Sequence, residues 1–436
     1  MTTQLLKGGQ LVELWPPSLA KADLRIEHGL IVARAASLRP RAGDKVLDLK
    51  GKIVMPGMVC AHTHLYSALA RGMPGPAQPP RNFVEILKKV WWKLDRALDR
   101  EAIYYSALIG AIEAARAGTT LVIDHHASPS FIRGALDTVR EALSTVGLRG
   151  ILCYETTDRG GEAELKAGLQ ENQDFITNVR HDEMLRGMVG AHAAFTLGFE
   201  SLRACGALAD KLGCGVHVHV AEDRCDAEAA RRRFRKSLVA RLRESDILKP
   251  ASILAHGTHL EDADLNEIQE AQSWLVHNPR SNMNNAVGYA PTARFGANAA
   301  LGTDGISSDM FDEIKWAFFK AQDAGRALTL PDVIRLSTGG ARLASTVFNK
   351  RFGSLRAGAV ADLIILDYPS PTPLHPSNLF GHMIFGISAA HVESVMVNGR
   401  FVVRNRTFPK LDLEAIYREA RRVAAKLWRK LVSHDH

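Results

Sequence analysis

The run Met55-Pro56-Gly57-Met58-Val59-Cys60-Ala61-His62-Thr63-His64 decides the fold class of this chain. Its apolar part, Met58–Ala61, has the length and composition of a short buried strand. Two histidines, His62 and His64, follow directly and lie two residues apart. Because residues i and i+2 of an extended segment point to the same side, both imidazoles can reach one metal ion. We therefore expect a strand that ends in a pair of metal ligands.

Seven more short apolar runs follow Met58–Ala61, and segments with helical periodicity separate them. The clearest helical segment is Tyr104–Ala117. Strands that alternate with helices indicate a parallel sheet, and eight strand–helix units are the number found in a (β/α)8 TIM barrel. The seven runs are Thr119–Ile123, Arg149–Tyr154, Gly187–Gly190, Gly215–Val220, Ser252–Ala255, Ser273–Val276 and Ala299–Leu301.

The two ends of the chain have β character without such helices. Beyond Leu355, Ala361–Leu366 and Val392–Val397 read as strands, and Phe401–Val403 follows the turn pair Asn398-Gly399. We predict one small β-sandwich domain built from residues 1–56 and 355–436, with the barrel (57–354) inserted between them. An amphipathic helix over Leu413–Leu431 is expected to end the chain. The strands expected near the N-terminus are Leu11–Leu14, Leu24–Glu27, Ile31–Arg34, Val46–Leu49 and Lys52–Val54.

The composition is that of an ordinary globular protein, with 46% hydrophobic and 23% charged residues in 436. The net charge is +8, from 55 Lys and Arg against 47 Asp and Glu. Much of the excess lies in Ala229–Arg243 and Tyr417–Lys430, in which aromatic residues of the kind that stack on bases are not interleaved with the charges, apart from Phe234 and Trp428. Such charge runs are usually solvated helix faces. We therefore expect no nucleic-acid partner.

Cysteine usage and hydropathy indicate the compartment. The five cysteines are odd in number and form no C-x-x-C pair, so they suit neither a disulfide framework nor a structural zinc site. The N-terminal residues lack the apolar core of a signal peptide, and no stretch approaches the roughly 18 apolar residues of a membrane span. We expect a soluble, cytoplasmic protein without a membrane partner, and a homodimer as the commonest default.

More polar residues follow the carboxyl ends of later predicted strands, which is where barrel enzymes keep their active sites. His219 ends the fifth strand and Glu222 follows it; His256 ends the sixth strand, and Asp304 follows the eighth. Any one of these histidines alone is more often a structural residue. The combination with the pair at residues 62 and 64 favours one metal centre on the barrel axis.

In this combination the chain resembles the amidohydrolase superfamily, in its branch of cytosine-deaminase-like and triazine-hydrolase-like enzymes. Within the barrel the resemblance rests on Ala61–Met73, Ile123–Pro129, His217–Glu222, Val276–Met283 and Leu301–Gly305. Gly353–Leu363 resembles the return of that family to its small β domain. The resemblance covers the chain to about Arg404.

The resemblance implies one divalent metal ion, most often zinc, although iron or manganese suits the same ligands. It implies Glu222 as the proton shuttle, His256 as the residue that polarises the reacting group, and His192 as a substrate contact after the fourth strand. The implied metal ligands are His62, His64, His219 and Asp304.

Three imidazoles and one carboxylate would leave a coordination position for water, and the metal would lower the pKa of that water toward about 7. Asp304 could then act as both ligand and base, Glu222 could protonate the departing nitrogen, and His256 could stabilise developing charge. No lysine at the end of the fourth strand could bridge a second metal ion, which favours a mononuclear site. The H-x-E and P-C-x-x-C signature of the other zinc deaminases is absent.

Three further residues are candidate substrate contacts: Arg81, His126 and Asn282. The segment from Pro79 to Trp92 follows the first strand, where relatives keep a lid, and we favour helix packing for Trp91 and Trp92. A structural role is the better interpretation of His217, and a brace for the Asp304 loop is that of Asp309. The role of His125 stays open between a contact in the site and packing.

These residues predict a hydrolase that acts on a non-peptide carbon–nitrogen bond. Deamination of a cyclic amidine or heterocyclic amine, with ammonia release, is the leading hypothesis, and a small nitrogen-containing molecule is the expected substrate. The same groups could instead hydrolyse a cyclic amide or displace a halide. An inactive barrel kept as a binding protein is a third alternative, which the complete set of ligands and Glu222 disfavours.

Overall fold

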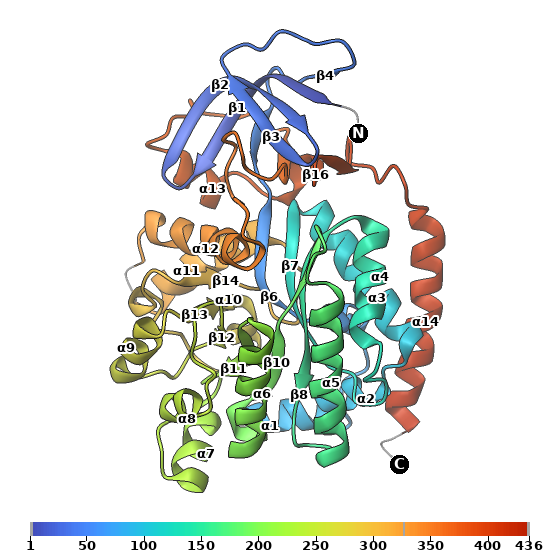
Figure 1. The fold of residues 1–436 in the computed structure, drawn as a ribbon, viewed down its shortest axis with the longest axis vertical. Helices are drawn as coiled ribbons and strands as arrows, with labels where there is room; N and C mark the ends of the chain where they lie inside the picture. The colour runs from blue at the N-terminus through green and yellow to red at the C-terminus, as the bar shows by residue number, and fades with distance from the viewer. Residues whose placement is uncertain (1–2, 326–327, 434–436) are drawn as a thin grey trace.

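A computed structural model describes residues 3–325 and 328–433 of the chain. Figure 1 shows a barrel of strands surrounded by helices, with a smaller β domain at its upper end. The N-terminal strands and the strands that follow the barrel lie together in this smaller domain. The last helix runs down the side of the barrel.

The barrel contains eight parallel strands, hydrogen-bonded in sequence order. A parallel bridge between Thr63 and Asp304 brings the first and last strands together. Each predicted run overlaps one of these strands, although Gly187–Gly190 begins before its strand, and the prediction of a (β/α)8 barrel is confirmed. The strands are β6 (Met58–Thr63), β7 (Thr119–His126), β8 (Arg149–Thr156), β10 (Val189–Ala193), β11 (Val216–Val220), β12 (Ile253–His256), β13 (Trp274–His277) and β14 (Ala299–Leu301).

Every residue of these eight strands is buried, which is the pattern of a parallel sheet covered on both faces. A helix follows each strand; the predicted helix Tyr104–Ala117 lies almost entirely within α3, which the Asp99 side chain caps by accepting from Ala102 N at 2.9 Å. The longer helices are α3 (Arg100–Arg116), α4 (Ala135–Val146), α5 (Glu162–Asn178), α6 (Phe199–Leu212), α8 (Leu238–Glu244), α9 (Asp262–Glu270), α11 (Met310–Asp323) and α12 (Leu330–Phe348).

Shorter elements fill the connections between the strands and helices. The strand β9 (Leu185–Gly187) pairs only with β8. The short helices of the barrel region are η1 (Leu65–Ala70), α1 (Phe83–Ile86), η2 (Leu87–Trp91), α2 (Trp92–Ala97), η3 (Ala194–Thr196), α7 (Arg224–Ala229), η4 (Ala230–Phe234), α10 (Pro279–Asn284) and η5 (Thr292–Arg294).

The small domain combines both ends of the chain, as predicted. Its strands follow the order β17-β16-β15-β5-β1-β2-β3, and β4 pairs with β1. A bulge between Leu6 and Gly9 divides β1, which pairs with β4 before the bulge and with β5 after it. The strands are β1 (Gln4–Leu14), β2 (Pro17–Glu27), β3 (Leu30–Ala35), β4 (Lys45–Asp48), β5 (Ile53–Pro56), β15 (Leu363–Leu366), β16 (Val392–Val397) and β17 (Arg400–Val403).

The pairing of β5 with β15 joins the two ends of the chain, with Met55 opposite Ile364. Side chains from both ends then share one apolar core, to which Leu24, Val54 and Leu363 all belong. The remaining elements after the barrel are α13 (Leu379–Phe385), η6 (Ala389–His391) and α14 (Leu413–Ser433).

A buried ion pair connects the barrel to the small domain. Nε of Arg149, at the start of β8, lies 2.6 Å from Oδ2 of Asp362, and their side chains are 0% and 4% exposed. The other Asp362 oxygen accepts from Asn398 N at 2.7 Å, in the turn between β16 and β17. Asp362 therefore links Arg149 of the barrel to the turn between β16 and β17 of the small domain.

The C-terminal helix α14 lies against the barrel helix α3 (Figure 1). Its buried side chains include Ala420, Val423 and Leu427, which recur at helical spacing on one face. The predicted amphipathic helix is thus present and packs on the barrel. None of the helices in the described part of the chain is long and apolar enough to cross a lipid bilayer.

Candidate active site

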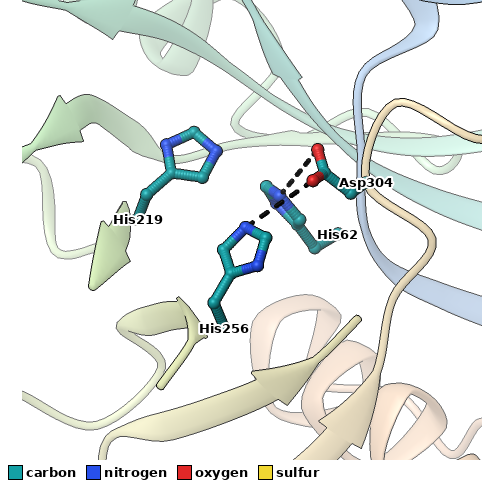
Figure 2. A group of neighbouring side chains, drawn as sticks. All are labelled: His62, His219, His256 and Asp304. Atoms are coloured by element: carbon teal, nitrogen blue, oxygen red, sulfur yellow. Dashed lines mark ion pairs between the residues drawn. The ribbon is translucent and has the colours of Figure 1, made fainter. Parts of the chain in front are cut away.

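Four side chains from separate strands converge on the barrel axis at the carboxyl ends of the strands (Figure 2). His62 lies in β6, His219 in β11 and His256 at the end of β12, while Asp304 follows β14. One potential ligand atom from each residue lies within 4.8 Å of the others. The prediction that polar strand ends meet at one point therefore agrees with this geometry.

His64 also belongs to this centre. Its Nε2 lies 3.2 Å from Nε2 of His219 and 3.0 Å from Oδ1 of Asp304. Nε2 of His62 lies 3.7 Å from the same oxygen. The structure therefore brings together all four residues that the sequence singled out as metal ligands, with His256 beside them.

Main-chain carbonyls orient two of these imidazoles. His64 Nδ1 donates to the carbonyl of His125 at 2.5 Å, and His219 Nδ1 donates to the carbonyl of His192 at 2.7 Å. Because a carbonyl oxygen can only accept, Nδ1 carries the proton in both rings. In the neutral rings, Nε2 then presents a lone pair to the centre, as a metal ligand must.

Side chains orient the other two imidazoles. His62 Nδ1 lies 2.8 Å from Nε2 of His217, and His256 Nδ1 donates to Oδ1 of Asn282 at 2.8 Å. His217 thus has the structural role that the sequence favoured. Asn282 contacts His256 and can hold its ring in place. The sequence suggested a substrate contact for Asn282 and did not suggest this role.

Two buried nitrogens in the centre lack a hydrogen-bond partner within the described residues, namely His62 Nε2 and His256 Nε2. An unpartnered buried nitrogen is costly unless something binds it. Burial and the neighbouring histidines hold the pKa of His62 and of His219 well below the ordinary value, so both rings are neutral. Although burial opposes it, the hydrogen bond and charge of Asp304 raise the pKa of His64 to about 9, so this ring would have to give up a proton to bind a metal ion. Three imidazoles and one carboxylate form a donor set that fits a divalent metal ion.

The backbone at three strand ends is turned sharply toward the axis. Ala221, His256 and Asp304 have φ angles of 50°, 77° and 54°, in the left-handed region that side chains with a Cβ seldom adopt. Such conformations persist where the surrounding structure enforces them, and they cluster at functional sites.

Glu222 lies at the edge of the centre, just after β11. Its Oε2 is 3.6 Å from Nε2 of His256, and its Oε1 accepts from Asn285 Nδ2 at 3.2 Å. Burial raises the pKa of Glu222 to about 7. The carboxyl group can therefore hold or release a proton near neutral pH, which is the property that a proton shuttle needs.

A cavity of about 160 Å³ opens beside the centre and is lined by His64, His192, Glu222 and Asp304, among others. The covering segment, residues 83–97, contains α1, η2 and α2 and forms one wall. Trp92 of this segment meets the His192 ring edge-on at 6.1 Å between centroids. Trp91 and Trp92 therefore pack against apolar neighbours, as predicted, and also line the cavity.

Two predicted substrate contacts lie elsewhere. The Arg81 side chain is 83% exposed and hydrogen-bonds Glu85, and it is not among the residues that line the cavity. His126 is buried, with Nε2 3.0 Å from Ser128 Oγ, and it does not line the cavity either. A substrate contact by either residue stays a prediction. Asp309 caps α11, which agrees with the bracing role expected for it.

Sequence reasoning missed four carboxylates that line the cavity, namely Asp95, Glu155, Asp223 and Asp226. Glu155 lies near the end of β8, so the rule that found His219 and Asp304 could also have found it. Asp95 lies in α2, where nothing in the sequence distinguishes it from a surface residue. His125 lies beneath the cavity, where its Nδ1 is 3.4 Å from Oε2 of Glu155.

A (β/α)8 barrel with this cluster of histidines and aspartate defines a hydrolase of the metal-dependent kind. The sequence profile of the Amidohydrolase family matches residues 53–402, and the chain belongs to that family. It is a metal-dependent aminohydrolase, an enzyme that acts on carbon–nitrogen bonds other than peptide bonds, and the expectation of this class is confirmed. The alternative of an inactive binding protein is not supported.

Two curated relatives resemble the chain over most of its length. The 5-methylthioadenosine/S-adenosylhomocysteine deaminase of Caldanaerobacter subterraneus is 31% identical over 407 residues, which cover 89% of this chain and 90% of that protein. The 5'-deoxyadenosine deaminase of Methanothermobacter thermautotrophicus is 30% identical over 436 residues, which cover 97% and 98%.

Solved structures share the fold. An adenosine deaminase from Xanthomonas campestris with bound zinc has a TM-score of 0.86 at 23% identity, covering 97% of this chain and 98% of its own. The atrazine chlorohydrolase TrzN from Arthrobacter aurescens, complexed with zinc, has a TM-score of 0.81 at 20% identity, covering 97% and 100%. The architecture of barrel and small β domain is common to all three.

Proposed function

We propose that this enzyme deaminates the adenine ring of a 5'-modified adenosine and holds one zinc ion at His62, His64, His219 and Asp304. The observation that carries the proposal is the placement of Glu222 in the cavity wall beside this cluster, with its Oε2 3.6 Å from Nε2 of His256. The names of the relatives at 31% and 30% identity supply the substrate class.

The donor set favours zinc among the divalent metals. Imidazole nitrogens with one carboxylate suit zinc, which accepts four ligands without a strong geometric preference. The structures of similar fold that carry zinc are consistent with this choice. A zinc ion at such a site supplies a Lewis acid that makes water a nucleophile at neutral pH.

Asp304 is placed to accept the proton that the attacking water gives up. Its Oδ1 accepts from Gly305 N at 2.8 Å, and its Oδ2 accepts a short hydrogen bond from Ser281 Oγ. These two contacts fix the carboxylate plane against the imidazoles. We assign to Asp304 the deprotonation of the attacking water.

Glu222 and His256 act on the carbon that bears the amino group. Nε2 of His256 lies 3.6 Å from Oε2 of Glu222 and 3.7 Å from Oδ2 of Asp304. We assign to this nitrogen the polarisation of the reacting group. Glu222 hands a proton to the departing nitrogen, which leaves as ammonia. Its pKa of about 7, raised by burial, suits a group that must be protonated in one step and ionised in another.

The cavity wall suits a planar heterocycle. Phe83, Trp91, Trp92 and Phe195 line it, so an aromatic ring can stack or pack edge-on while its exocyclic amine points toward Glu222. His192 Nδ1 lies 2.6 Å from Thr196 Oγ1, which leaves Nε2 for the cavity. We assign the substrate contact of His192 to this nitrogen.

The test is ammonia release by the zinc-loaded enzyme with adenosine, 5'-deoxyadenosine, 5'-methylthioadenosine and S-adenosylhomocysteine. A parallel panel of pterins, pyrimidines and triazines, including a chlorinated triazine, covers the competing reactions. We expect ammonia in equal amount to the inosine-type product. Turnover of another substrate without ammonia, for example with chloride release, would contradict the deaminase assignment. A cytoplasmic location and a homodimer are further proposals, which cell fractionation and light scattering test.

A further inference from the structure

A second group of side chains suited to a cation lies beside the zinc ligands proposed above. One ligand atom each of Glu155, His192 and His219 lies within 4.8 Å of the others. The same holds for His64, His125 and His219. A neutral imidazole nitrogen has one lone pair, and Nε2 of His219 lies 3.2 Å from Nε2 of His64 in the first centre. The groups that remain for a second ion are therefore Glu155, His125 and His192.

The ring of His125 turns a lone pair toward Glu155. Its Nε2 lies 3.2 Å from the carbonyl oxygens of both Ala191 and His217. Because a carbonyl oxygen can only accept, Nε2 carries the proton, and Nδ1 of the neutral ring is an acceptor. This Nδ1 is buried and has no hydrogen-bond partner among the described residues, and it lies 3.4 Å from Oε2 of Glu155.

The ring of His192 turns a lone pair toward the same carboxylate. The hydroxyl of Thr196 donates its only proton to the carbonyl of Ala193 at 3.0 Å, so it accepts from Nδ1 of His192 at 2.6 Å. Nε2 of the neutral ring is then an acceptor, 3.8 Å from Oε1 of Glu155. Each oxygen of the Glu155 carboxylate therefore has an imidazole lone pair as a neighbour.

This arrangement of acceptors is unfavourable without a cation. The side chains of His125, His192 and Glu155 are 0%, 8% and 3% exposed, so water screens them little. Arg159 Nη2 donates to Oε1 of Glu155 at 2.8 Å, which leaves the other oxygen opposite Nδ1 of His125. A buried acceptor without a donor is costly, and a bound cation would replace the repulsion by coordination.

The donor set and its spacing suit a divalent metal ion. Two imidazole nitrogens and one carboxylate are ligands that zinc accepts, with water in the remaining position. Two ligand atoms of a tetrahedral zinc ion lie about 3.3 Å apart, because each is bound at about 2.0–2.1 Å. The 3.4 Å between Nδ1 of His125 and Oε2 of Glu155 agrees with this spacing, and the 3.8 Å between Nε2 of His192 and Oε1 is slightly longer.

The second ion should bind more weakly than the first. The two groups of ligands are neighbours, since the ring centroids of His125 and His219 lie 4.7 Å apart. Like charges at short range in a partly desolvated site repel. Asp304 serves the first centre and Glu155 the second, so a bridging carboxylate does not offset this repulsion. We therefore expect occupancy only when zinc exceeds the first equivalent.

We propose that Glu155, His125 and His192 form a second, weaker site for a divalent metal ion, and that an ion bound there inhibits the enzyme. Glu155 and His192 line the cavity, so the ion would stand where substrate enters. The inhibition rests on the proposed function, which assigns Nε2 of His192 to the substrate. The binding of the ion does not depend on that function.

The test is equilibrium dialysis of the enzyme that already holds one equivalent of zinc, against zinc up to about 1 mM. We expect a second equivalent in the wild type. Glu155→Gln should keep the first equivalent and bind the second at least about 10-fold more weakly, because a neutral amide replaces the anionic ligand. A wild type that binds only one equivalent would overturn the inference, as would a Glu155→Gln variant that binds the second as tightly as the wild type.

Asp223→Asn is the matched control. Asp223 lines the same cavity but belongs to neither group of ligands, and its side chain caps α7 by accepting from Cys225 N at 2.9 Å. Asparagine caps a helix as well as aspartate does, so this variant removes one negative charge without removing the cap. It should bind the second equivalent as the wild type does. An equal loss in both variants would attribute the binding to the overall charge of the cavity and refute a specific site.

Anomalous diffraction at the zinc edge locates the second ion without any variant, so the inference is decided even if Glu155→Gln folds poorly. Wild-type crystals soaked in excess zinc should show two peaks, the second against Nδ1 of His125 and the carboxylate of Glu155. A single peak at the first centre, or a second peak elsewhere, would contradict the proposed site.

Inhibition is measured with 5'-methylthioadenosine over the same range of zinc. KM should rise with occupancy of the second site while kcat stays near its value with one equivalent, because ion and substrate compete for Nε2 of His192. An unchanged KM with the second site full would overturn the competition. If no adenine compound releases ammonia, the proposed function fails, whereas dialysis and diffraction still decide the second site.

Discussion

Asn282 offers a sharp test of how this site works, because its side chain touches His256 and does not line the cavity. Oδ1 accepts the Nδ1 proton of His256 at 2.8 Å, and both residues are buried. Asn282→Leu keeps the approximate volume but removes the acceptor, so the buried His256 donor loses its partner.

The expected loss can be worked out from this single contact. A buried donor left without a partner costs about 1–3 kcal/mol. If the whole amount is felt in the transition state, where His256 must hold its orientation, the rate falls by about 5- to 150-fold. Because the ground-state substrate does not meet Asn282, kcat should fall while KM stays near its wild-type value.

Asn282→Asp provides the rescue variant. It retains an oxygen acceptor for His256, and the amide nitrogen that it loses has no hydrogen-bond partner among the described residues. We expect it to keep kcat well above that of Asn282→Leu. Steady-state ammonia release with the best nucleoside substrate measures both parameters, and bound zinc is quantified in parallel. A rise in KM with unchanged kcat would refute the positioning role and support a direct substrate contact by Asn282.

Three further outcomes are expected. Glu222→Gln should retain about one equivalent of zinc but lose about 10²- to 10⁴-fold in turnover, since an amide cannot carry the proton; full activity would exclude the shuttle role. Arg149→Met should lower the free energy of unfolding in urea by about 3–5 kcal/mol, because it leaves the buried Asp362 carboxylate without its ion-pair partner. Arg149→Met/Asp362→Leu should recover much of the loss, and equal stability of the single and double variants would contradict this. Chelation of zinc should lower the thermal midpoint and abolish turnover, both reversed by zinc, whereas an unaffected midpoint would argue against His62, His64 and His219 as ligands.

The barrel could be predicted because each of its strands is recognisable from its own local sequence. Runs such as Leu121–Ile123 and Val216–Val220 are buried on both faces, so they read as short apolar segments without any knowledge of the fold. The alignment of parallel strands at their carboxyl ends then placed His62, His219 and Asp304 together. Here local sequence and global topology give the same answer.

The rest of the site depends on contacts that cross between elements. The main-chain carbonyls of His125 and His192 orient His64 and His219. Because every residue has a main-chain carbonyl, these contacts cannot be recognised from residue type. Asp95 lines the cavity because the covering segment packs over the barrel mouth. The periodicity of strands and helices in the sequence does not predict this packing.

The orientation of the Arg81 side chain could not be predicted from the sequence either. Its charge and its position after the first strand made it a reasonable candidate, but the guanidinium turns to Glu85 four residues later. Arg81 lies before the N-cap of α1, and an ion pair with an exposed guanidinium is a local interaction of modest energy. Sequence alone cannot decide whether such a side chain turns into the cavity or toward a neighbouring carboxylate.

The pairing of β5 with β15 has a consequence for biosynthesis. As the chain leaves the ribosome, β1 to β5 emerge first, but the strand that completes their sheet is synthesised only after the whole barrel. The nascent N-terminal strands must therefore wait with an unpaired edge, and such edges invite misassociation. Long-range pairing of this kind is also slow to form. Truncated chains that stop before Leu363 would keep this edge open, so the sheet can close only after the whole barrel has been synthesised.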